Sequence, residues 1–347
     1  MRGFGFEEHG GLDRLRFVEV PEPTAGPGEV RVRIRAAGFN HLDRFVLEGI
    51  PGVPIERPHV LGSDGAGEVD SVGPGVDGLE PGTRVLLNPG LWDGTCDACR
   101  AGDEALCRRY RILGEHTQGS ATDFVVVPRR NVHPLPAHLT FAEGAAVPLV
   151  SLTAWRALKT VGQVKPGERV AVVGAGGGTS TAAVQIAKLL GARVAVATRS
   201  AEKAERARQI GVADALVFDD TDRPLDRVLW EWSEKKGVDV IVDSVGTPTV
   251  PRSLRALARA GRLVVFGATA GGVAEVDLRM LFWRQGSLRG TTMAGAREFA
   301  EVLAEIAAGR LRAVIDSELP FEHAAEAFRR FDQPDLFGKV VVRMPSG

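Results

Sequence analysis

Three cysteines and an aspartate lie in one short segment and have the spacing of metal ligands. Asp93, Cys96, Cys99 and Cys107 are separated by two, two and seven residues. Closed structural zinc sites take four tetrahedral ligands of sulfur, nitrogen or oxygen type, and short spacings bring such ligands around one ion. Polar neighbours such as Asp97 fit the alternative of three buried free thiols less well. The sequence therefore predicts one structural zinc ion, with Asp93 as the fourth ligand.

A run of glycines follows an apolar segment and precedes a helical pattern. Arg169 to Val173 has the composition of a buried strand, and Thr181 to Leu190 has helical periodicity. A strand, a tight glycine turn and a helix start present backbone N–H groups to a pyrophosphate. A flexible turn is the alternative, but the flanking elements favour dinucleotide binding. The residues expected to contact the dinucleotide here are Gly174, Gly176, Gly177, Gly178, Thr179 and Ser180.

The residues after the next predicted strand bear on the choice of nucleotide. An adenosine ribose with free hydroxyls is usually held by a carboxylate about 20 residues after the glycines, and Thr198 occupies that place. Arg199, Ser200 and Lys203 follow and could receive a 2′-phosphate through charge-assisted hydrogen bonds. The alternative is that they are solvated residues at a helix start. NADP(H) is therefore favoured over NAD(H).

Composition limits the classes of protein to consider. A length of 347 residues suits two domains, and 44% hydrophobic with 25% charged residues is typical of a globular protein. A net charge of −1 and the lack of a basic cluster argue against a nucleic-acid partner. No apolar run approaches the roughly 18 to 20 residues of a membrane span. We expect a soluble, cytoplasmic protein in which the three cysteines bind metal rather than form disulfides.

The elements that must position these residues change character near residue 145. Before it, short β-branched runs such as Val30 to Ile34 and Arg84 to Leu87 are separated by glycine and proline, which indicates a β-rich region. After it, apolar strands alternate with helical patterns, which indicates a parallel sheet with helices on both faces. The C-terminal segment, with a predicted strand from Lys339 to Val342, is too short to stand alone and is expected to return to the first domain.

These segments together resemble the medium-chain dehydrogenase/reductase superfamily, which includes zinc-type alcohol dehydrogenases and quinone oxidoreductases. The matching stretches are residues 36–43, 62–69, the cysteine segment, 148–155, the glycine run and 338–342. The resemblance implies an α/β fold of two domains. Residues 1–147 and 296–347 would form a GroES-like β-rich catalytic domain with a zinc lobe at 88–110. Residues 148–295 would form a Rossmann domain, with a doubly wound parallel sheet, that binds NAD(P).

The resemblance also bears on the catalytic centre. Zinc-type alcohol dehydrogenases hold a catalytic zinc at positions that match Asn40, Ser63 and Leu149–Val150 of this chain. Asn and Ser oxygens bind zinc poorly, and only the neighbouring Asp64 is a strong ligand. The positions of the family's hydroxyl and histidine proton relay are Leu42 and Phe45, which cannot pass a proton. We therefore expect no tightly held catalytic zinc.

The hypothesis that follows is hydride transfer from NADPH to a quinone or an activated enone. Asn40, His41 and Asp64 are the catalytic candidates, and His116 and Tyr110 are weaker ones. The structural alternatives are that Asn40 caps a helix, that His41 only touches the cofactor phosphate and that Asp64 is a turn acid. Further cofactor-binding residues implied by family position are His41, Thr153 and Gly267.

Two other functions remain open. One is a zinc-type NAD(P)-dependent alcohol dehydrogenase that recruits its metal through Asp64 and unexpected neighbours. The other is a sensor that binds NADPH without turnover. The expected partners are a small carbonyl, enone or quinone substrate and further copies of the chain, with neither nucleic acid nor membrane. Family members pair through the Rossmann sheet edge, here Leu281 to Thr292, so a homodimer or homotetramer is expected.

Overall fold

The computed structural model describes residues 1–345, which divide into two compact units. The first unit contains residues 1–149, 295–307 and 312–347, and the second contains residues 150–294 and 308–311. The C-terminal segment therefore belongs to the same unit as the N-terminal half. Within residues 1–345, every helix is too short or too polar to cross a lipid bilayer.

The first unit is organised around the long strand β3 (Glu29–Phe39). Its side chains alternate between buried and half-exposed from Glu29 onward, because one face packs on a core while the other meets solvent. The strand pairs antiparallel with β5, β9 and β18. The full sheet order is β10 (Val132–Pro134), β6 (Arg84–Leu87), β5 (Asp64–Val72), β3, β18 (Lys339–Arg343) and β17 (Ile315–Pro320), with β9 (Phe124–Pro128) also paired to β3.

A second, smaller sheet completes the core of this unit. Its order is β2 (Arg16–Glu19), β1 (Arg2–Phe6) and β4 (His59–Val60). Phe4 of β1 packs on Phe39 of β3 with ring centroids 5.9 Å apart, and Phe328 of helix α11 (Ala324–Arg329) meets the other side of Phe39 at 5.4 Å. Aromatic packing of this kind joins the two chain ends to the central strand.

The second unit contains a six-stranded sheet in which all neighbours are parallel. The order is β13 (Asp214–Val217), β12 (Arg193–Thr198), β11 (Arg169–Val173), β14 (Val238–Asp243), β15 (Leu257–Val265) and β16 (Ser287–Gly290). In chain order this is 3-2-1-4-5-6, the doubly wound arrangement of dinucleotide-binding domains. The predicted α/β fold class, a GroES-like unit and a Rossmann unit, is confirmed.

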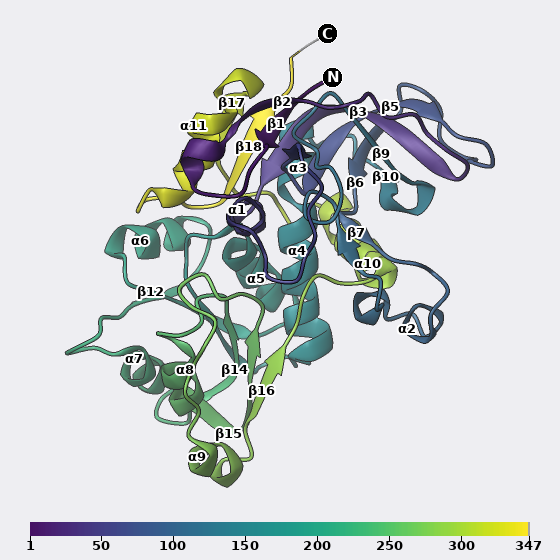
Figure 1. Ribbon diagram of the computed structural model, residues 1–347. Helices are drawn as coiled ribbons and strands as arrows, with labels where there is room; N and C mark the ends of the chain where they lie inside the picture. The colour runs from purple at the N-terminus through teal and green to yellow at the C-terminus, as the bar shows by residue number, and fades with distance from the viewer. Residues whose placement is uncertain (346–347) are drawn as a thin grey trace. The chain divides into compact units, whose positions relative to one another are not determined.

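Helices cover both faces of this parallel sheet (Figure 1). Leu229 of α7 (Leu225–Trp232) and Leu254 of α8 (Val250–Ala256) share one core with Ala171 and Val173 of β11. The alternate residue Val172 is also fully buried, on the side where α5 (Gly178–Leu189) contacts the sheet. The strands are apolar throughout because neither face meets water.

The remaining elements connect or flank these sheets. They are α1 (His41–Glu48), β7 (Gly90–Leu91), α2 (Asp97–Arg100), β8 (Arg111–Ile112), α3 (Phe141–Ala146), α4 (Pro148–Trp155), α6 (Ala201–Gln209), α9 (Leu278–Trp283) and α10 (Ala296–Ala307), besides short 3-10 and π turns.

Candidate functional site

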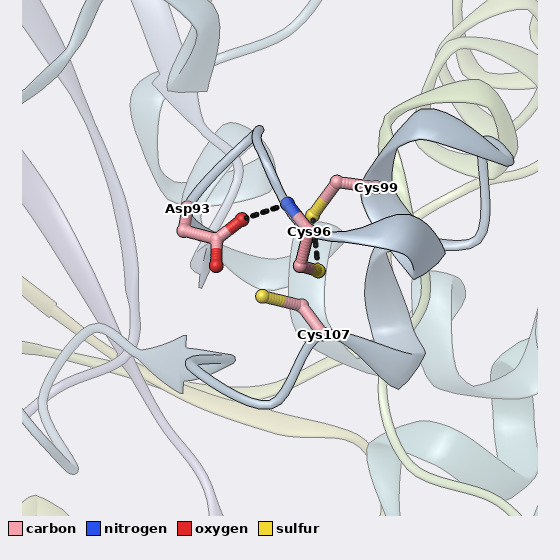
Figure 2. Close-up of side chains that lie close together, drawn as sticks. All are labelled: Asp93, Cys96, Cys99 and Cys107. Carbon is pink, nitrogen blue, oxygen red and sulfur yellow. Dashed lines mark hydrogen bonds between the residues drawn. The ribbon is translucent and has the colours of Figure 1, made fainter.

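The structure brings the four predicted metal ligands together. The carboxylate of Asp93 and the sulfurs of Cys96, Cys99 and Cys107 face one another, and their ligand atoms all lie within 4.8 Å of one another (Figure 2). Helix α2 sets this geometry, because Cys96 is its N-cap and Cys99 lies one turn later. A 3-10 turn then returns the chain to Cys107.

This arrangement fits a tetrahedral zinc ion. With zinc–sulfur bonds of about 2.3 Å, sulfurs around one ion lie roughly 3.8 Å apart, and the Cys96 and Cys99 sulfurs are 3.5 Å apart. Backbone N–H groups of Thr95 and Cys96 donate to one oxygen of Asp93 and hold the pKa of that carboxyl well below its usual range. Asp93 therefore remains ionised, and its second oxygen is not engaged by these amides.

The predicted phosphate-binding residues gather at the carboxyl end of β11. Gly174 adopts a φ of +89°, a conformation that favours glycine, and starts the turn into α5. The N-cap Gly177 makes no side-chain hydrogen bond to the first turn of this 12-residue helix. The first N–H groups of a helix have no intrahelical acceptors, so this loop suits a pyrophosphate.

The residues expected to select the nucleotide lie at the end of the neighbouring strand β12. Thr198 accepts the N–H of Ser200, and the Ser200 hydroxyl caps α6 by accepting the N–H of Lys203. Arg199 forms an ion pair with Asp220, at 2.9 Å, in which both side chains are more than half exposed. The predicted 2′-phosphate ligands are thus close together, but the Arg199 guanidinium already has a carboxylate partner.

Two further predicted cofactor residues also lie in the second unit. Gly267 follows β15, and a Cβ there would lie 3.2 Å from the Ser244 carbonyl oxygen, so the backbone is closely packed. Thr153 in α4 is buried, and its hydroxyl lies 3.7 Å from the Met293 sulfur. A buried carboxylate that the sequence analysis did not single out, Asp243, ends β14 and accepts four hydrogen bonds there. Asp243 therefore fixes the next turn along the same sheet edge.

A buried polar network occupies the end of β3 in the first unit. The Lys339 ammonium donates to Asp64 Oδ2 at 2.8 Å, to Asn40 Oδ1 at 2.6 Å and to the Phe39 carbonyl at 2.7 Å. The Asn40 amide donates to the same Asp64 oxygen at 3.0 Å, and the Leu149 N–H donates to the other at 2.8 Å. Asp64 is fully buried, and Lys339 and Asn40 are almost so. The network is therefore closely satisfied within the first unit.

The strongest potential metal ligand of this network, Asp64, has both oxygens engaged by hydrogen bonds. One oxygen accepts from an ammonium and an amide, and the other accepts from a backbone N–H. The remaining candidates are the neutral oxygens of Asn40 and Ser63, which zinc binds poorly. Ser63 is fully buried, and its hydroxyl has no hydrogen-bond partner within residues 1–345. This donor set is therefore a poor chemical match for a zinc ion.

Two more buried carboxylates lie beside this network. Asp43 accepts the N–H groups of Asn40 and Gly62, yet burial raises its pKa to about 7. Burial and the nearby Asp43 charge raise the pKa of Glu115 to about 7. Both groups hold a proton far more readily than an exposed carboxyl does.

The histidine and tyrosine candidates have different surroundings. His41, the first residue of α1, is half-buried, and its ring packs against Phe331 at 5.0 Å. His116 Nδ1 accepts the N–H of Ile112, and burial followed by the charge of Arg111 lowers its pKa. The Tyr110 hydroxyl packs closely on Gly90: a Cβ added at Gly90 would lie only 2.2 Å from the hydroxyl oxygen. The phenol is thus held against the backbone beside the zinc lobe.

Lys339 is the residue of this network that the sequence analysis did not assign to a site. It stands directly before the apolar run Val340 to Val342, a position where a lysine would normally mark a solvent-exposed strand end. The one sequence signal that could have identified Lys339 is a charged residue at the start of an otherwise apolar strand. If such a lysine is buried, it requires a charged or polar partner.

Two family models match most of the chain. Residues 26–137 match the alcohol dehydrogenase GroES-like domain, and residues 178–308 match the zinc-binding dehydrogenase family. The first of these falls in the unit that contains the zinc lobe and the Lys339 network. The second begins at Gly178, at the end of the glycine turn, and covers most of the second unit together with residues 295–307 of the first.

Individual proteins are similar over nearly the full length. A zinc-type alcohol dehydrogenase-like protein of Schizosaccharomyces pombe is 31% identical, with 97% of each chain covered. The acryloyl-coenzyme A reductase of Metallosphaera sedula is 30% identical, with 93% of this chain and 95% of the relative covered. The crystal structure of an NAD-dependent alcohol dehydrogenase aligns with a TM-score of 0.94 and 41% identity, covering 99% of this chain and 100% of the other.

Proposed function

Since the chain belongs to the medium-chain dehydrogenase/reductase superfamily and is an oxidoreductase of that type, we propose that it reduces an activated acceptor with NADPH and without a catalytic zinc. The acceptor is a quinone or an α,β-unsaturated carbonyl compound, in which the reacting carbon is already electron-poor. Asn40, His41 and Asp64 are the proposed catalytic residues.

The observation that carries this proposal is the pairing of Lys339 with Asp64. The carboxylate that would be the strongest metal ligand is neutralised by a buried ammonium at 2.8 Å. A divalent cation would have to displace that ammonium and would gain only neutral oxygen donors in return. The chemistry of this centre therefore has to rely on hydrogen-bond donors and on an acceptor that needs little polarisation.

Asn40 is the residue best placed to serve as that donor. Its amide nitrogen carries two hydrogens, and Asp64 accepts one of them. Lys339 holds the carbonyl end of the same amide and so fixes which way it faces. The second N–H is proposed to stabilise the negative charge that develops on the acceptor oxygen. Lys339 and Asp64 act here as positioning residues.

His41 is proposed to move the proton. Reduction of an α,β-unsaturated carbonyl adds hydride at the β-carbon and a proton at the α-carbon, and reduction of a quinone ends with protonation of oxygen. The His41 imidazole is half-buried and directly follows Asn40 in the chain, and an imidazole has the chemistry of a general acid or base. NADPH, when bound, supplies the hydride.

The glycine turn and the residues after β12 are proposed to hold NADPH. The uncapped first turn of α5 suits the pyrophosphate. Arg199, Ser200 and Lys203 cluster where the 2′-phosphate would be received, and the position of the ribose carboxylate is Thr198. These features support NADP(H) over NAD(H), although the structural relative above is NAD-dependent. One zinc ion held by Asp93, Cys96, Cys99 and Cys107 is proposed as a structural stabiliser of its lobe.

An unsaturated thioester is the acceptor class with the most direct support among the relatives. The Metallosphaera sedula relative is an acryloyl-coenzyme A reductase, and acryloyl thioesters are activated α,β-unsaturated carbonyl compounds. Alcohol oxidation is the second candidate, favoured by the structural relative named as an alcohol dehydrogenase. Within residues 1–345, the unpartnered Ser63 hydroxyl is a buried group that could assist a metal there, and it adds little affinity.

Self-association through the edge of the Rossmann sheet is proposed on the same family basis. Strand β16 is an edge strand, and Leu278, Phe282 and Trp283 of the adjoining α9 are about two-thirds exposed. Exposed apolar side chains and an unpaired strand edge both commonly mark an interface. Sedimentation of the wild type and of Trp283→Ser tests this, because the substitution should favour smaller species; a wild-type monomer would contradict it.

The proposed reaction is tested by following oxidation of NADPH and of NADH with quinones, enones, unsaturated thioesters, aldehydes and ketones. Reduction of quinones or α,β-unsaturated compounds with NADPH supports the proposal. Oxidation of alcohols with no reduction of activated acceptors supports the alcohol dehydrogenase alternative. Tight NADPH binding with no turnover of any acceptor points to a sensor.

A further inference from the structure

The first unit contains a cavity that none of the groups described above fills. Its volume is about 590 Å³, within the usual range for binding sites of organic ligands. One wall is the loop with Val53 and Pro54, and the other is the segment from Arg108 to Arg111 that follows the last cysteine. His116 and Trp92 complete the lining.

The cavity wall carries three guanidinium groups without carboxylate partners. Arg108, Arg109 and Arg111 are all exposed, and none forms an ion pair with any residue in the range 1–345. In contrast, Arg330 in the same unit binds both Asp316 and Asp335. Three adjacent exposed arginines without carboxylate partners leave their guanidinium N–H groups available to an anion.

One acid lies beside the cavity: the Glu115 carboxyl is 3.7 Å from His116 Nδ1, and burial raises its pKa to about 7, which limits the negative charge that it adds. Asp93 is the sole carboxylate among the ten lining residues, and its oxygen accepts hydrogen bonds from Thr95 and Cys96 within the metal cluster. The charge of Arg111 also reaches His116, because it contributes, after burial, to lowering the pKa of that imidazole. The cavity is therefore positively charged.

The cavity lies next to the buried network in the same unit. His116 follows Glu115, and the Glu115 carboxyl senses the charge of Asp43, which in turn binds the Asn40 backbone N–H. Glu115 and Asp43 therefore lie between the cavity wall and the start of α1, within one unit.

We propose that the arginine cavity binds the phosphorylated end of an unsaturated coenzyme A thioester. The inference rests on the proposed reduction of unsaturated acceptors and names one class of them. Arginine binds phosphate oxygens bidentately, and three side chains match the several phosphates of the 3′-phosphoadenosine diphosphate group. The cavity volume exceeds what inorganic phosphate alone would fill.

The first test measures binding and does not depend on turnover. Free coenzyme A and pantetheine, which lacks the nucleotide, are titrated calorimetrically into protein saturated with NADP⁺, so that the dinucleotide site is occupied. We expect coenzyme A to bind and pantetheine to bind far more weakly. The combined variant Arg108→Gln, Arg109→Gln and Arg111→Gln should weaken coenzyme A binding at least about tenfold, and added salt should weaken the wild type more than the variant.

A control at arginines outside the cavity separates local from general effects of lost positive charge. Arg259→Gln with Arg279→Gln removes two exposed arginines of the second unit that also lack ion-pair partners within residues 1–345. It should leave coenzyme A affinity unchanged. Zinc content and thermal unfolding of the triple variant show whether the lobe remains folded.

The second test compares the KM of crotonyl-coenzyme A with that of crotonyl-pantetheine. The triple variant should raise the first at least about tenfold and leave the second within about twofold. Equal coenzyme A affinity in wild type and triple variant, or no coenzyme A binding at all, overturns the inference. If coenzyme A binds through the arginines but no unsaturated compound is reduced, the cavity assignment stands and the proposed function fails.

Discussion

The Lys339 ammonium and the Asp64 carboxylate lie 2.8 Å apart, with 4% and 0% of their side chains exposed. They come from residues 275 positions apart in the sequence, joined because β18 and β5 both pair with β3. The pair holds the Asn40 amide in place from both ends. Its geometry explains why this centre is organised around a hydrogen-bond donor.

Breaking this pair should be far more damaging than breaking a surface pair. Lys339→Met leaves Asp64 buried without its counter-charge, which costs about 3–5 kcal/mol of unfolding free energy. Arg343→Met, in the same strand, removes an exposed pair with Glu318 and should cost at most about 1 kcal/mol. Guanidinium unfolding measures both. Similar losses in the two variants would contradict the buried pairing.

The zinc lobe gives a prediction about metal content. Purified protein should contain zinc at the Asp93 cluster, and Cys107→Ser should lose it and destabilise the lobe, since structural zinc contributes folding free energy. Asp93→Asn, which removes the negative charge, should weaken zinc affinity on the order of tenfold. Asp97→Asn in the same loop, where the side chain is fully exposed, is the matched control. Competition with a chromogenic chelator reports the affinities, and unchanged affinity in Asp93→Asn would exclude Asp93 as a ligand.

Glu115 should make stability depend on pH. Its pKa rises from 4.5 to about 7 on folding, so the folded chain keeps a proton that the unfolded chain releases. The contribution is fully present below pH 4.5 and is lost as pH rises through about 7, a change of about 3 kcal/mol. Asp43 acts in the same direction.

Glu115→Gln isolates this effect. The variant should be less sensitive to pH between about 4.5 and 7 and more stable than the wild type at pH 8. Glu56→Gln, at an exposed glutamate, should follow the wild-type curve. Urea unfolding across this range provides the comparison. A stability that falls from pH 5 to 7 as steeply in Glu115→Gln as in the wild type would contradict the burial of a protonated Glu115.

The Arg199–Asp220 pair gives a prediction about nucleotide selection. Arg199→Gln should raise the KM for NADPH about tenfold with little effect on NADH, because one charge-assisted hydrogen bond to the 2′-phosphate is lost. Asp220→Asn frees Arg199 from an exposed pair and should lower the KM for NADPH by a few-fold at most. Glu202→Gln, in the next helix, is the control. Equal changes in the KM for NADPH and the KM for NADH would contradict the assignment of a 2′-phosphate site.

Regular elements were predictable where periodicity alone decides them. The predicted strands Arg84 to Leu87 and Arg169 to Val173 are β6 and β11. The predicted helix from Thr181 begins earlier, at Gly178, because glycine and polar residues carry no helical periodicity at the start. The start of strand β15 at Leu257 is hard to predict, because Arg259 and Gly261 interrupt its apolar pattern.

The candidate site was predictable only in part. The metal ligands and the glycine turn are local in sequence, so their spacing carries the information. The burial of Lys339 depends on β18 pairing with β3, and the arginine cavity depends on loop 52–54 folding against Arg108 to Arg111. Both contacts join segments that are far apart in the sequence, so no periodic pattern predicts either of them. The domain boundaries and the roles of the site residues stay predictions.

The central claim is tested most directly by counting zinc per chain in protein that is reducing an unsaturated acceptor with NADPH. We predict one zinc ion per chain in the wild type and none in Cys107→Ser. Brief treatment with a chelator should leave the turnover rate of the wild type unchanged. Two zinc ions per chain, with chelator-sensitive alcohol oxidation and no reduction of activated acceptors, would contradict the account.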